Sequence, residues 1–221
     1  MFWRKKQLQY KLSQSLQLDA KLSNMSFTVF DTETTGFSID TCDRLIEIGA
    51  VHVERLEVTD RTFQTFVNPA RDIPSHITKL TSIEQQHVDQ APTSLDAIKS
   101  YFRFVEDNKS YGWIGHHLNF DTMVIKQELH RAKYSYEEPS NFDTFDLIDY
   151  IAPTSHRRDL EGYATIFGTQ IFERHRALGD ALTTAHLFVE ILKRLEYQGI
   201  TTLSDLLRLK NINAQRKVAI F

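Results

Sequence analysis

Three short stretches in the first third of the chain are apolar or alternate between apolar and polar residues. They are residues 27–30 (FTVF), 45–53 (LIEIGAVHV) and 61–67 (RTFQTFV). Runs of this length with a period of two are typical of β-strands. Short connections separate them, which indicates an antiparallel meander.

Later segments carry apolar residues at helical spacing. The pattern predicts helices over residues 93–106, 120–132, 160–167, 180–196 and 203–209, and a further strand over 111–115. Residues 142–148 are predicted as a fifth strand or as a junction between a strand and a helix. Strands that come first, followed by strands alternating with helices, indicate an α/β fold in which helices cover a mixed sheet.

The two ends of the chain stand apart from this pattern. Residues 1–24 place leucines at 8, 12, 16 and 22 among basic residues, which predicts an amphipathic helical extension. Such a helix would pack back onto the domain or dock a partner; a nucleic-acid backbone or a membrane surface is a further alternative. Residues 25–198 are predicted as one domain, and 199–221 as a C-terminal helix and tail.

Composition narrows the function classes. The chain has 221 residues, 41% of them hydrophobic and 25% charged, which argues against disorder. A net charge of −3 gives no overall basic field, so any nucleic-acid surface must be a local patch. The single cysteine, Cys42, excludes an internal disulfide or a cysteine-based zinc site and suits a reducing, cytoplasmic location. Neither a membrane span nor a secretory signal is expected, because no long apolar run occurs.

Two acids follow the first predicted strand. Asp31 and Glu33 are two residues apart and precede the turn signal Thr34-Thr35-Gly36, so both side chains project to one side. Two like charges at the end of a buried strand are costly unless a cation lies between them, and Mg²⁺ prefers such oxygen ligands. A polar loop is the alternative for this pair alone. A haloacid-dehalogenase-type phosphatase is another, although its second acid is Asp rather than Glu.

Further acids occur at the starts of later helices. Asp121 opens a helix after the fourth strand, and Asp180 opens the long helix just after His175. If these acids converge with Asp31 and Glu33, they suit a two-metal hydrolysis of a phosphodiester. Since imidazole titrates near neutral pH, His175 would take the proton from the attacking water.

With these motifs the sequence resembles the DEDD family of 3′–5′ exonucleases, in the subclass with histidine as base. That family includes the epsilon subunit of bacterial DNA polymerase III and RNase T. FDTETTG matches its first motif, GHHLNFDTMVI its second and HRALGDALTTAHLF its third, in the family's order. The resemblance implies an RNase H-like mixed sheet of five strands and two Mg²⁺ or Mn²⁺ ions. Carried over by position, it implies the metal ligands Asp31, Glu33, Asp121 and Asp180, with His175 as general base.

Substrate contacts are predicted beside these motifs. Thr34, Thr35 and Phe37 would border the terminal nucleotide, with backbone amides of the turn holding its sugar and Phe37 stacking on its base. Phe37 capping the edge of the core is the alternative. His116 would also contact substrate, and His117 stands where the family usually has Asn.

Charged residues near the motifs have two interpretations each. Glu47 interrupts an apolar strand and is either a partner of the site or, as we favour, exposed on the outer face of the sheet. Nearby arginines would meet phosphates or lie in a solvated loop; they are Arg157, Arg158, Arg174 and Arg176.

The expected function is a metal-dependent 3′–5′ exonuclease that releases nucleoside 5′-monophosphates from DNA, in proofreading or repair. Its partners would be nucleic acid and a DNA polymerase or another replication or repair protein, without a membrane. The rival activity is an exoribonuclease, because no residue reads the 2′-hydroxyl unambiguously. A rival of another class is a non-catalytic module that docks on a polymerase.

Overall fold

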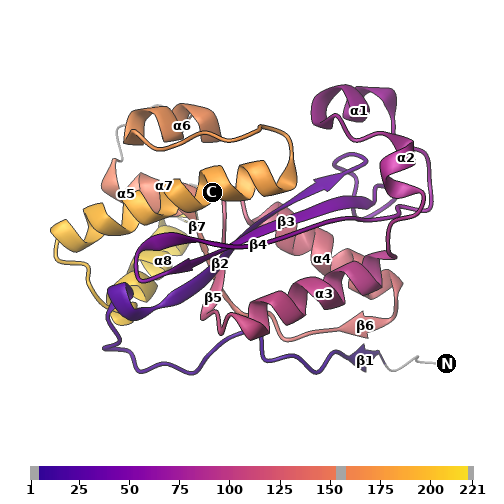
Figure 1. Ribbon diagram of the computed structural model, residues 1–221. Helices are drawn as coiled ribbons and strands as arrows, with labels where there is room; N and C mark the ends of the chain where they lie inside the picture. The colour runs from indigo at the N-terminus through magenta and orange to yellow at the C-terminus, as the bar shows by residue number, and fades with distance from the viewer. Residues whose placement is uncertain (1–4, 153–157, 219–221) are drawn as a thin grey trace.

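The sheet at the centre of the protein carries the antiparallel meander at one side and parallel strands at the other. The computed structural model describes residues 5–152 and 158–218, with side chains described as far as residue 211. In this part of the chain five strands pair in the order β4-β3-β2-β5-β7 (Figure 1). Their bounds are β2 Ser26–Thr34, β3 Leu45–Glu54, β4 Glu57–Phe66, β5 Gly112–Gly115 and β7 Ser140–Asp143. β3 is antiparallel to β2 and β4, whereas β5 is parallel to β2 and β7, so the predicted mixed sheet is confirmed.

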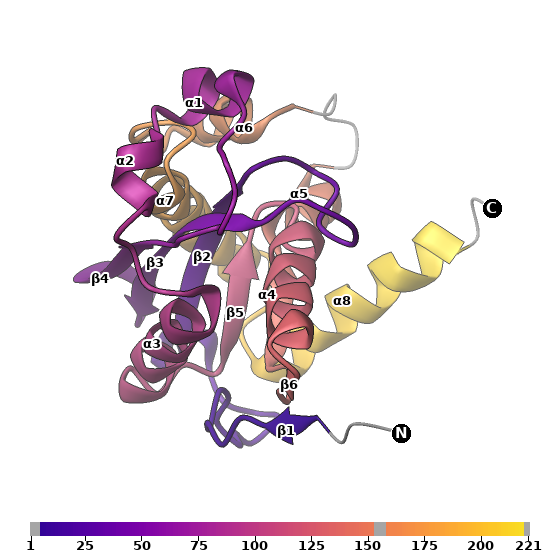
Figure 2. The ribbon, with the colours of Figure 1, turned by 90° about the vertical axis from the view of Figure 1, so that its right-hand side faces the viewer.

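Helices cover both faces of this sheet, as predicted. The helices are α1 Ser75–Thr81, α2 Gln85–Val88, α3 Ser94–Asp107, α4 Asn119–Arg131, α5 Thr144–Ile151, α6 Leu160–Phe167, α7 Ala177–Tyr197 and α8 Leu203–Val218. Figures 1 and 2 show α7 and α6 on one face and α3 and α4 on the other. None of these helices is long and apolar enough to cross a membrane.

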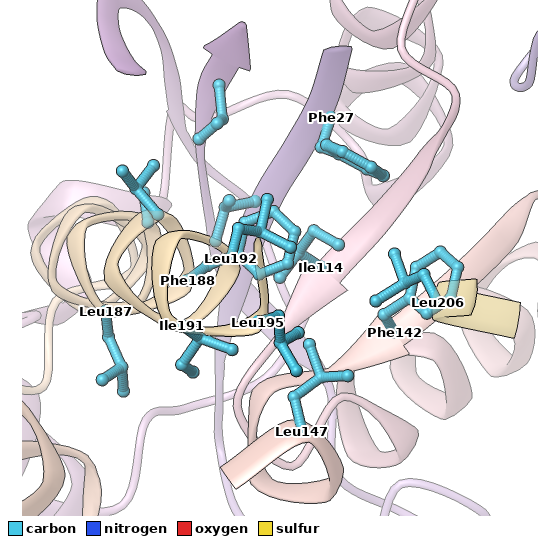
Figure 3. Close-up of a cluster of buried hydrophobic side chains, with 14 of the residues drawn as sticks. Phe27, Ile114, Phe142, Leu147, Leu187, Phe188, Ile191, Leu192, Leu195 and Leu206 are labelled. Atoms are coloured by element: carbon cyan, nitrogen blue, oxygen red, sulfur yellow. The ribbon is translucent and has the colours of Figure 1, made fainter. Parts of the chain in front are cut away.

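Each face has its own hydrophobic core. Phe27 and Val29 of β2 pack with α5, α6, α7 and α8, where Phe188 of α7 stacks edge-on against Phe27 (Figure 3). Phe30, the residue directly after Val29, points to the other face and packs with α3 and α4 around Trp113. Successive residues of β2 therefore contact the helices on opposite faces of the sheet. The same alternation predicts the face on which each later side chain of the strand lies.

A glycine lets α7 lie close against the sheet. A Cβ atom added at Gly49 of β3 would lie 2.1 Å from the backbone nitrogen of Leu178 and 2.2 Å from the carbonyl carbon of Ala177. Real Cβ atoms essentially never approach this closely. The first turn of α7 is consequently seated directly on β3, beside the position where β3 pairs with β2.

The helix predicted near the N-terminus is wrong for the described residues 5–24. Lys6–Gln7 forms a short strand, β1, that pairs in parallel with β6 (Tyr134–Ser135), and a 3-10 turn, η1, spans Leu22–Asn24. The leucines are still used, because Leu8 and Leu12 enter the core on the α3 and α4 side and Leu22 enters the other. Backbone hydrogen bonds to distant segments, rather than to the next turn, hold this stretch extended.

β2 ends at Thr34, so Asp31 and Glu33 lie in its C-terminal part, as predicted. Of the two alternatives for residues 142–148, the junction of a strand and a helix is confirmed: β7 ends at Asp143, which accepts a hydrogen bond from the backbone nitrogen of Phe145 as the cap of α5. Other boundaries differ from the predicted ones, because β4 begins at Glu57 rather than at 61 and α7 at Ala177 rather than at 180. α8 extends beyond residue 209 to Val218, and Figure 2 shows its C-terminal part projecting from the body of the protein.

Candidate active site

Strand β2 directs Asp31 and Glu33 toward helix α7. Both acids continue the row of Phe27 and Val29, whose side chains pack on the α7 side of the sheet. Asp31 pairs across the ladder with Gly49, the residue on which α7 is seated. The strand therefore delivers both acids to the start of that helix.

Asp180, in the first turn of α7, meets them there. Carboxylate oxygens of Asp31, Glu33 and Asp180 all lie within 4.8 Å of one another. Because the N-terminus of a helix carries partial positive charge, it favours an ionised carboxylate at this position. Residues separated by almost 150 positions thus share one small volume, as the sequence predicted.

Asp121, in the first turn of α4, approaches from the other face of the sheet. Its Oδ1 accepts hydrogen bonds from the backbone nitrogen of Thr32, at 2.9 Å, and from the Thr32 hydroxyl, at 2.6 Å. Thr32 lies between Asp31 and Glu33, and Asp121 is buried. Asp121 is not among the residues whose oxygens all lie within 4.8 Å of one another, but burial and, in addition, the charge of Asp121 raise the pKa of both Asp31 and Glu33, so Asp121 adjoins the other three acids. We call the set of Asp31, Glu33, Asp121 and Asp180 the acidic cage.

The cage is electrostatically strained without a cation. Burial, followed by the charges of the neighbouring acids, raises the pKa of Asp31 well above its usual value and that of Glu33 to about 8. Burial also raises the pKa of Asp121 to about 7 and raises that of Asp180, although Arg174 opposes the latter rise. Among the residues whose side chains are described, 5–152 and 158–211, none donates a hydrogen bond to the carboxylate of Asp31 or Glu33. Crowded carboxylates without donors are the oxygen-rich setting that Mg²⁺ or Mn²⁺ requires, so the residues fit such ions.

His175 lies immediately beside this cage. Its backbone nitrogen donates to Oδ2 of Asp180 at 3.2 Å, and its backbone is left-handed, with φ of 59°. A non-glycine residue rarely adopts this conformation, and such residues concentrate at functional sites. The loop before α7 therefore holds His175 next to Asp180, and its role as a general base stays a prediction.

Glu47 is buried, so the outward-facing position that we favoured from the sequence is wrong. Its Oε1 accepts from Nη2 of Arg176 at 2.9 Å and its Oε2 from the backbone nitrogen of Ala177 at 2.9 Å. This pair fastens the loop that carries His175 to strand β3. The signal was present in the sequence, since a glutamate within an uninterrupted apolar strand requires a buried counter-charge.

Of the predicted substrate contacts in the turn after β2, Thr34 and Thr35 are hydrogen-bonded within the protein. The hydroxyl of Thr34 donates to the carbonyl of Gly36 at 2.7 Å, and that of Thr35 donates to Asp43 at 2.8 Å. The backbone nitrogen of Thr35 is also bonded, to the carbonyl of Arg44. Both threonines thus build the turn in this structure. Substrate contact by either one stays a prediction.

Phe37 is the exposed residue of this turn. Its side chain is 83% exposed and lies 5.6 Å, between ring centroids, from Phe120 of α4. The alternative in which Phe37 caps the core is therefore wrong. The exposed ring of Phe37, next to the partly buried Phe120 at the start of α4, has a free face for a base to stack on.

His116 lies deeper than its predicted contact with substrate suggests. Its Nδ1 is 2.8 Å from the hydroxyl of Thr144, and its Nε2 is buried without a partner among the described residues. Burial, followed by the charge of His117, lowers the pKa of His116 to about 4. His117 has a left-handed backbone, and its nitrogen donates to Asp143 at 3.1 Å.

The four arginines predicted to meet phosphates have different environments. Arg157 lies outside the described residues. Arg158 lines a cavity of about 620 Å³ together with Phe120 and Phe145. Arg174 donates to Oδ1 of Asp180, and Arg176 is held by Glu47. Neither ion pair was predicted, because the spacing of Arg174 from Asp180, or of Arg176 from Glu47, matches no recognisable sequence pattern.

Comparison with known proteins identifies relatives of this arrangement. A family model described as "Exonuclease" (RNase_T) matches residues 28–188, which include the whole acidic cage and His175. The chain is 35% identical over 180 residues to the PolC-type DNA polymerase III of Caldanaerobacter subterraneus subsp. tengcongensis, covering 81% of this chain and 12% of that protein. It is 31% identical over 188 residues to the 3′–5′ exonuclease DinG of Bacillus subtilis, covering 85% of this chain and 20% of that one. The chain thus spans a fifth or less of the length of these relatives.

A solved structure shares the fold. The nuclease domain of 3′hExo, described as a DEDDh family member bound to rAMP, superimposes with a TM-score of 0.67. The match covers 79% of this chain and 94% of that domain at 19% identity. The RNase H-like α/β fold predicted from the sequence is confirmed.

Proposed function

Because the chain belongs to the exonuclease family whose model it matches, we propose that it is a metal-dependent 3′–5′ exonuclease acting on DNA. The observation that carries the proposal is the meeting of Asp31, Glu33 and Asp180 oxygens within 4.8 Å, with Asp121 behind them. Such a cage, next to a histidine, suits hydrolysis of a phosphodiester.

The acidic cage would hold two Mg²⁺ or Mn²⁺ ions. Ions bound there supply Lewis-acid stabilisation of the phosphate oxygens and lower the pKa of a bound water. Asp31 and Glu33 reach the site from β2, Asp180 from α7 and Asp121 from α4, so separate rigid elements fix the oxygens that orient the ions.

His175 would act as the general base. It accepts a proton from the attacking water as the water oxygen bonds to the terminal phosphorus. The bond from that phosphorus to the 3′-oxygen of the preceding nucleotide breaks. The products are a nucleoside 5′-monophosphate and a strand that ends in a new 3′-hydroxyl. The Glu47–Arg176 pair keeps the base in place by fixing the loop to β3.

Two features support a nucleic-acid strand end as substrate. Phe37, in the turn that follows Asp31 and Glu33, has an exposed ring that rests against the partly buried ring of Phe120, and the terminal base would stack on it. The similar proteins are named as a DNA polymerase and an exonuclease, which favours DNA and a role in replication or repair beside a polymerase in the cytoplasm. RNA is the second candidate, since 3′hExo is described with rAMP bound.

The experiment uses matched single-stranded DNA and RNA oligonucleotides labelled at the 5′ end, with Mn²⁺ or Mg²⁺. We expect a ladder of shortened DNA and release of 5′-monophosphates, both abolished by Asp31→Asn and Asp180→Asn in protein that still folds. Near-normal turnover by both variants would refute the cage. Faster shortening of RNA would make the protein an exoribonuclease, and no cleavage of either strand would leave a docking module.

A further inference from the structure

Arg174, a positively charged residue of the protein itself, forms an ion pair with Asp180, one of the acids of the acidic cage. Nη1 of Arg174 donates to Oδ1 of Asp180, and the two side chains are 22% and 9% exposed. Arg174 also acts on the neighbouring acids: burial and adjacent acids raise the pKa values of Asp31 and Glu33, and the charge of Arg174 opposes the rise. Its guanidinium is therefore within electrostatic reach of all three carboxylates.

Other arginines near the site have partners outside the cage. Arg176, two residues further on, is bound by Glu47, and Arg44 is bound by Glu128. Among the described side chains, those of residues 5–152 and 158–211, Arg174 is the one cationic side chain that forms an ion pair with an acid of the cage. Its position is thus not a general consequence of basic residues nearby.

Asp180 has both of its oxygens engaged. Oδ1 accepts from Arg174, and Oδ2 accepts from the backbone nitrogen of His175 at 3.2 Å. A divalent cation that coordinates Asp180 must therefore share an oxygen with one of these donors or displace it. Removing the backbone donor would require the loop to move, whereas removing Arg174 requires only rotation of a long side chain.

The loop backbone is poorly able to move. A Cβ atom added at Gly179 would lie 1.9 Å from the carbonyl oxygen of Glu173, so the residue before Arg174 is packed directly on α7. The bond between Glu47 and Arg176 fixes the other side of His175. The flexible element of this contact is consequently the arginine side chain.

We propose that Arg174 is a built-in cation of the acidic cage that competes with the divalent ion for Asp180 and so sets the metal concentration that the protein requires. The inference rests on the proposed metal-dependent function. Without divalent ions, the guanidinium neutralises part of the buried negative charge and stabilises the cage. With them, it is a like charge beside the ion and opposes binding.

The test measures Mn²⁺ binding to the full chain by isothermal titration calorimetry, without nucleic acid. Arg174→Met removes the charge and keeps an unbranched side chain of moderate length. We expect it to bind Mn²⁺ roughly tenfold or more tightly than the unaltered protein, because a positive charge next to the ion is removed. The matched control is Arg61→Met, since Arg61 pairs with Glu54, which lies opposite Ser26 at the far end of β2, and its side chain is 45% exposed.

Thermal unfolding gives a second, independent measurement. Without metal, Arg174→Met should melt at a lower temperature than the unaltered protein, and added Mn²⁺ should raise its melting temperature by a larger amount. If that variant does not fold, Arg174→Lys is the substitute. Lysine keeps the charge but lacks the planar guanidinium group, and the Arg174→Lys protein should bind Mn²⁺ more tightly than the unaltered protein does.

The outcomes separate this inference from the proposed function. If the unaltered protein binds no Mn²⁺, the metal cage itself is wrong. If it binds Mn²⁺ but the Arg174 variants bind it equally well or more weakly, the competition is refuted and the cage stands. Unchanged binding by Arg61→Met confirms that the effect is local.

Discussion

Gly49→Ala is expected to disable the site without touching any of its acids. Gly49 lies on β3, where it pairs with Asp31 of β2 and supports the first turn of α7. The added methyl group would lie 2.1 Å from the backbone nitrogen of Leu178, and ordinary van der Waals contact begins at 3.4 Å. The start of α7 must therefore move away by about 1.3 Å, because its backbone cannot rotate aside as a side chain can.

The expected cost follows from that displacement. Asp180 is carried by the same turn, so its carboxylate moves by a comparable distance from Asp31 and Glu33. A misplacement of about 1 Å in a catalytic group can lower the rate roughly a hundredfold. Inserting a methyl group into a close-packed contact also costs about 1–3 kcal/mol of folding free energy.

Single-turnover cleavage of a 5′-labelled oligonucleotide at saturating Mn²⁺ measures the first effect, and urea unfolding measures the second. The control is Gly199→Ala. That glycine follows α7 with φ of +84° and has no atom within 4 Å of an added Cβ. The substitution should cost about 1 kcal/mol from backbone strain but leave cleavage unchanged. Full activity in Gly49→Ala would show that the seat of α7 on β3 does not set the geometry of the cage.

Three further outcomes are expected. Glu47→Gln should lower the free energy of unfolding by roughly 1–3 kcal/mol and slow cleavage, because Arg176 loses its charged partner; an unchanged urea midpoint would contradict this. Thr32→Val removes the hydroxyl that donates to Asp121 and should cost about 1 kcal/mol and several-fold in rate, measured by the same two assays; equal rates would show that the backbone nitrogen of Thr32 suffices. Because burial, then neighbouring charge, raises the pKa of Glu33 to about 8, Mn²⁺ must displace protons, so calorimetric affinity should rise with pH and level off above about 8; a pH-independent affinity would refute it.

The stability of the metal-free protein should change with pH in the direction opposite to the Mn²⁺ affinity. Carboxylates whose folded pKa is raised stabilise the fold fully below their unfolded pKa, and this contribution is lost as pH rises through the folded value. Stability without metal should therefore decline toward about pH 8, the value that burial and then Asp180 give Glu33. Mn²⁺ should reverse the decline.

The strands and the acids of the site could be predicted because their signals are local. Asp31 and Glu33 follow an apolar run, and Asp180 follows a clear helix start, so each could be assigned to an element by its neighbours in sequence. Their convergence then followed from the family resemblance, and the structure brings Asp31, Glu33 and Asp180 together, with Asp121 bound to Thr32 beside them.

The features that were not predicted depend on contacts between segments that are separate in the sequence. Glu47 and Arg174 take their roles from partners that other segments supply, and a single sequence without covarying positions gives no pairing signal. Leucines at 8 and 12 have helical spacing, yet the chain is extended there because β6 supplies hydrogen-bonding groups that sequence spacing cannot reveal. Leu8 and Leu12 are buried, as expected if this segment packs on the domain, but its conformation depends on tertiary neighbours.

The segment before β2 and the segment after α7 pair with each other through backbone contacts. The backbone nitrogen of Leu22 donates to the carbonyl of Thr201 at 2.9 Å, and Lys21 forms a bridge with Thr202. The chain therefore enters β2 and leaves α7 at neighbouring positions on the protein. A unit with this topology can be spliced into a larger host chain while the host's two cut ends remain side by side, so neither partner must stretch to accommodate the other.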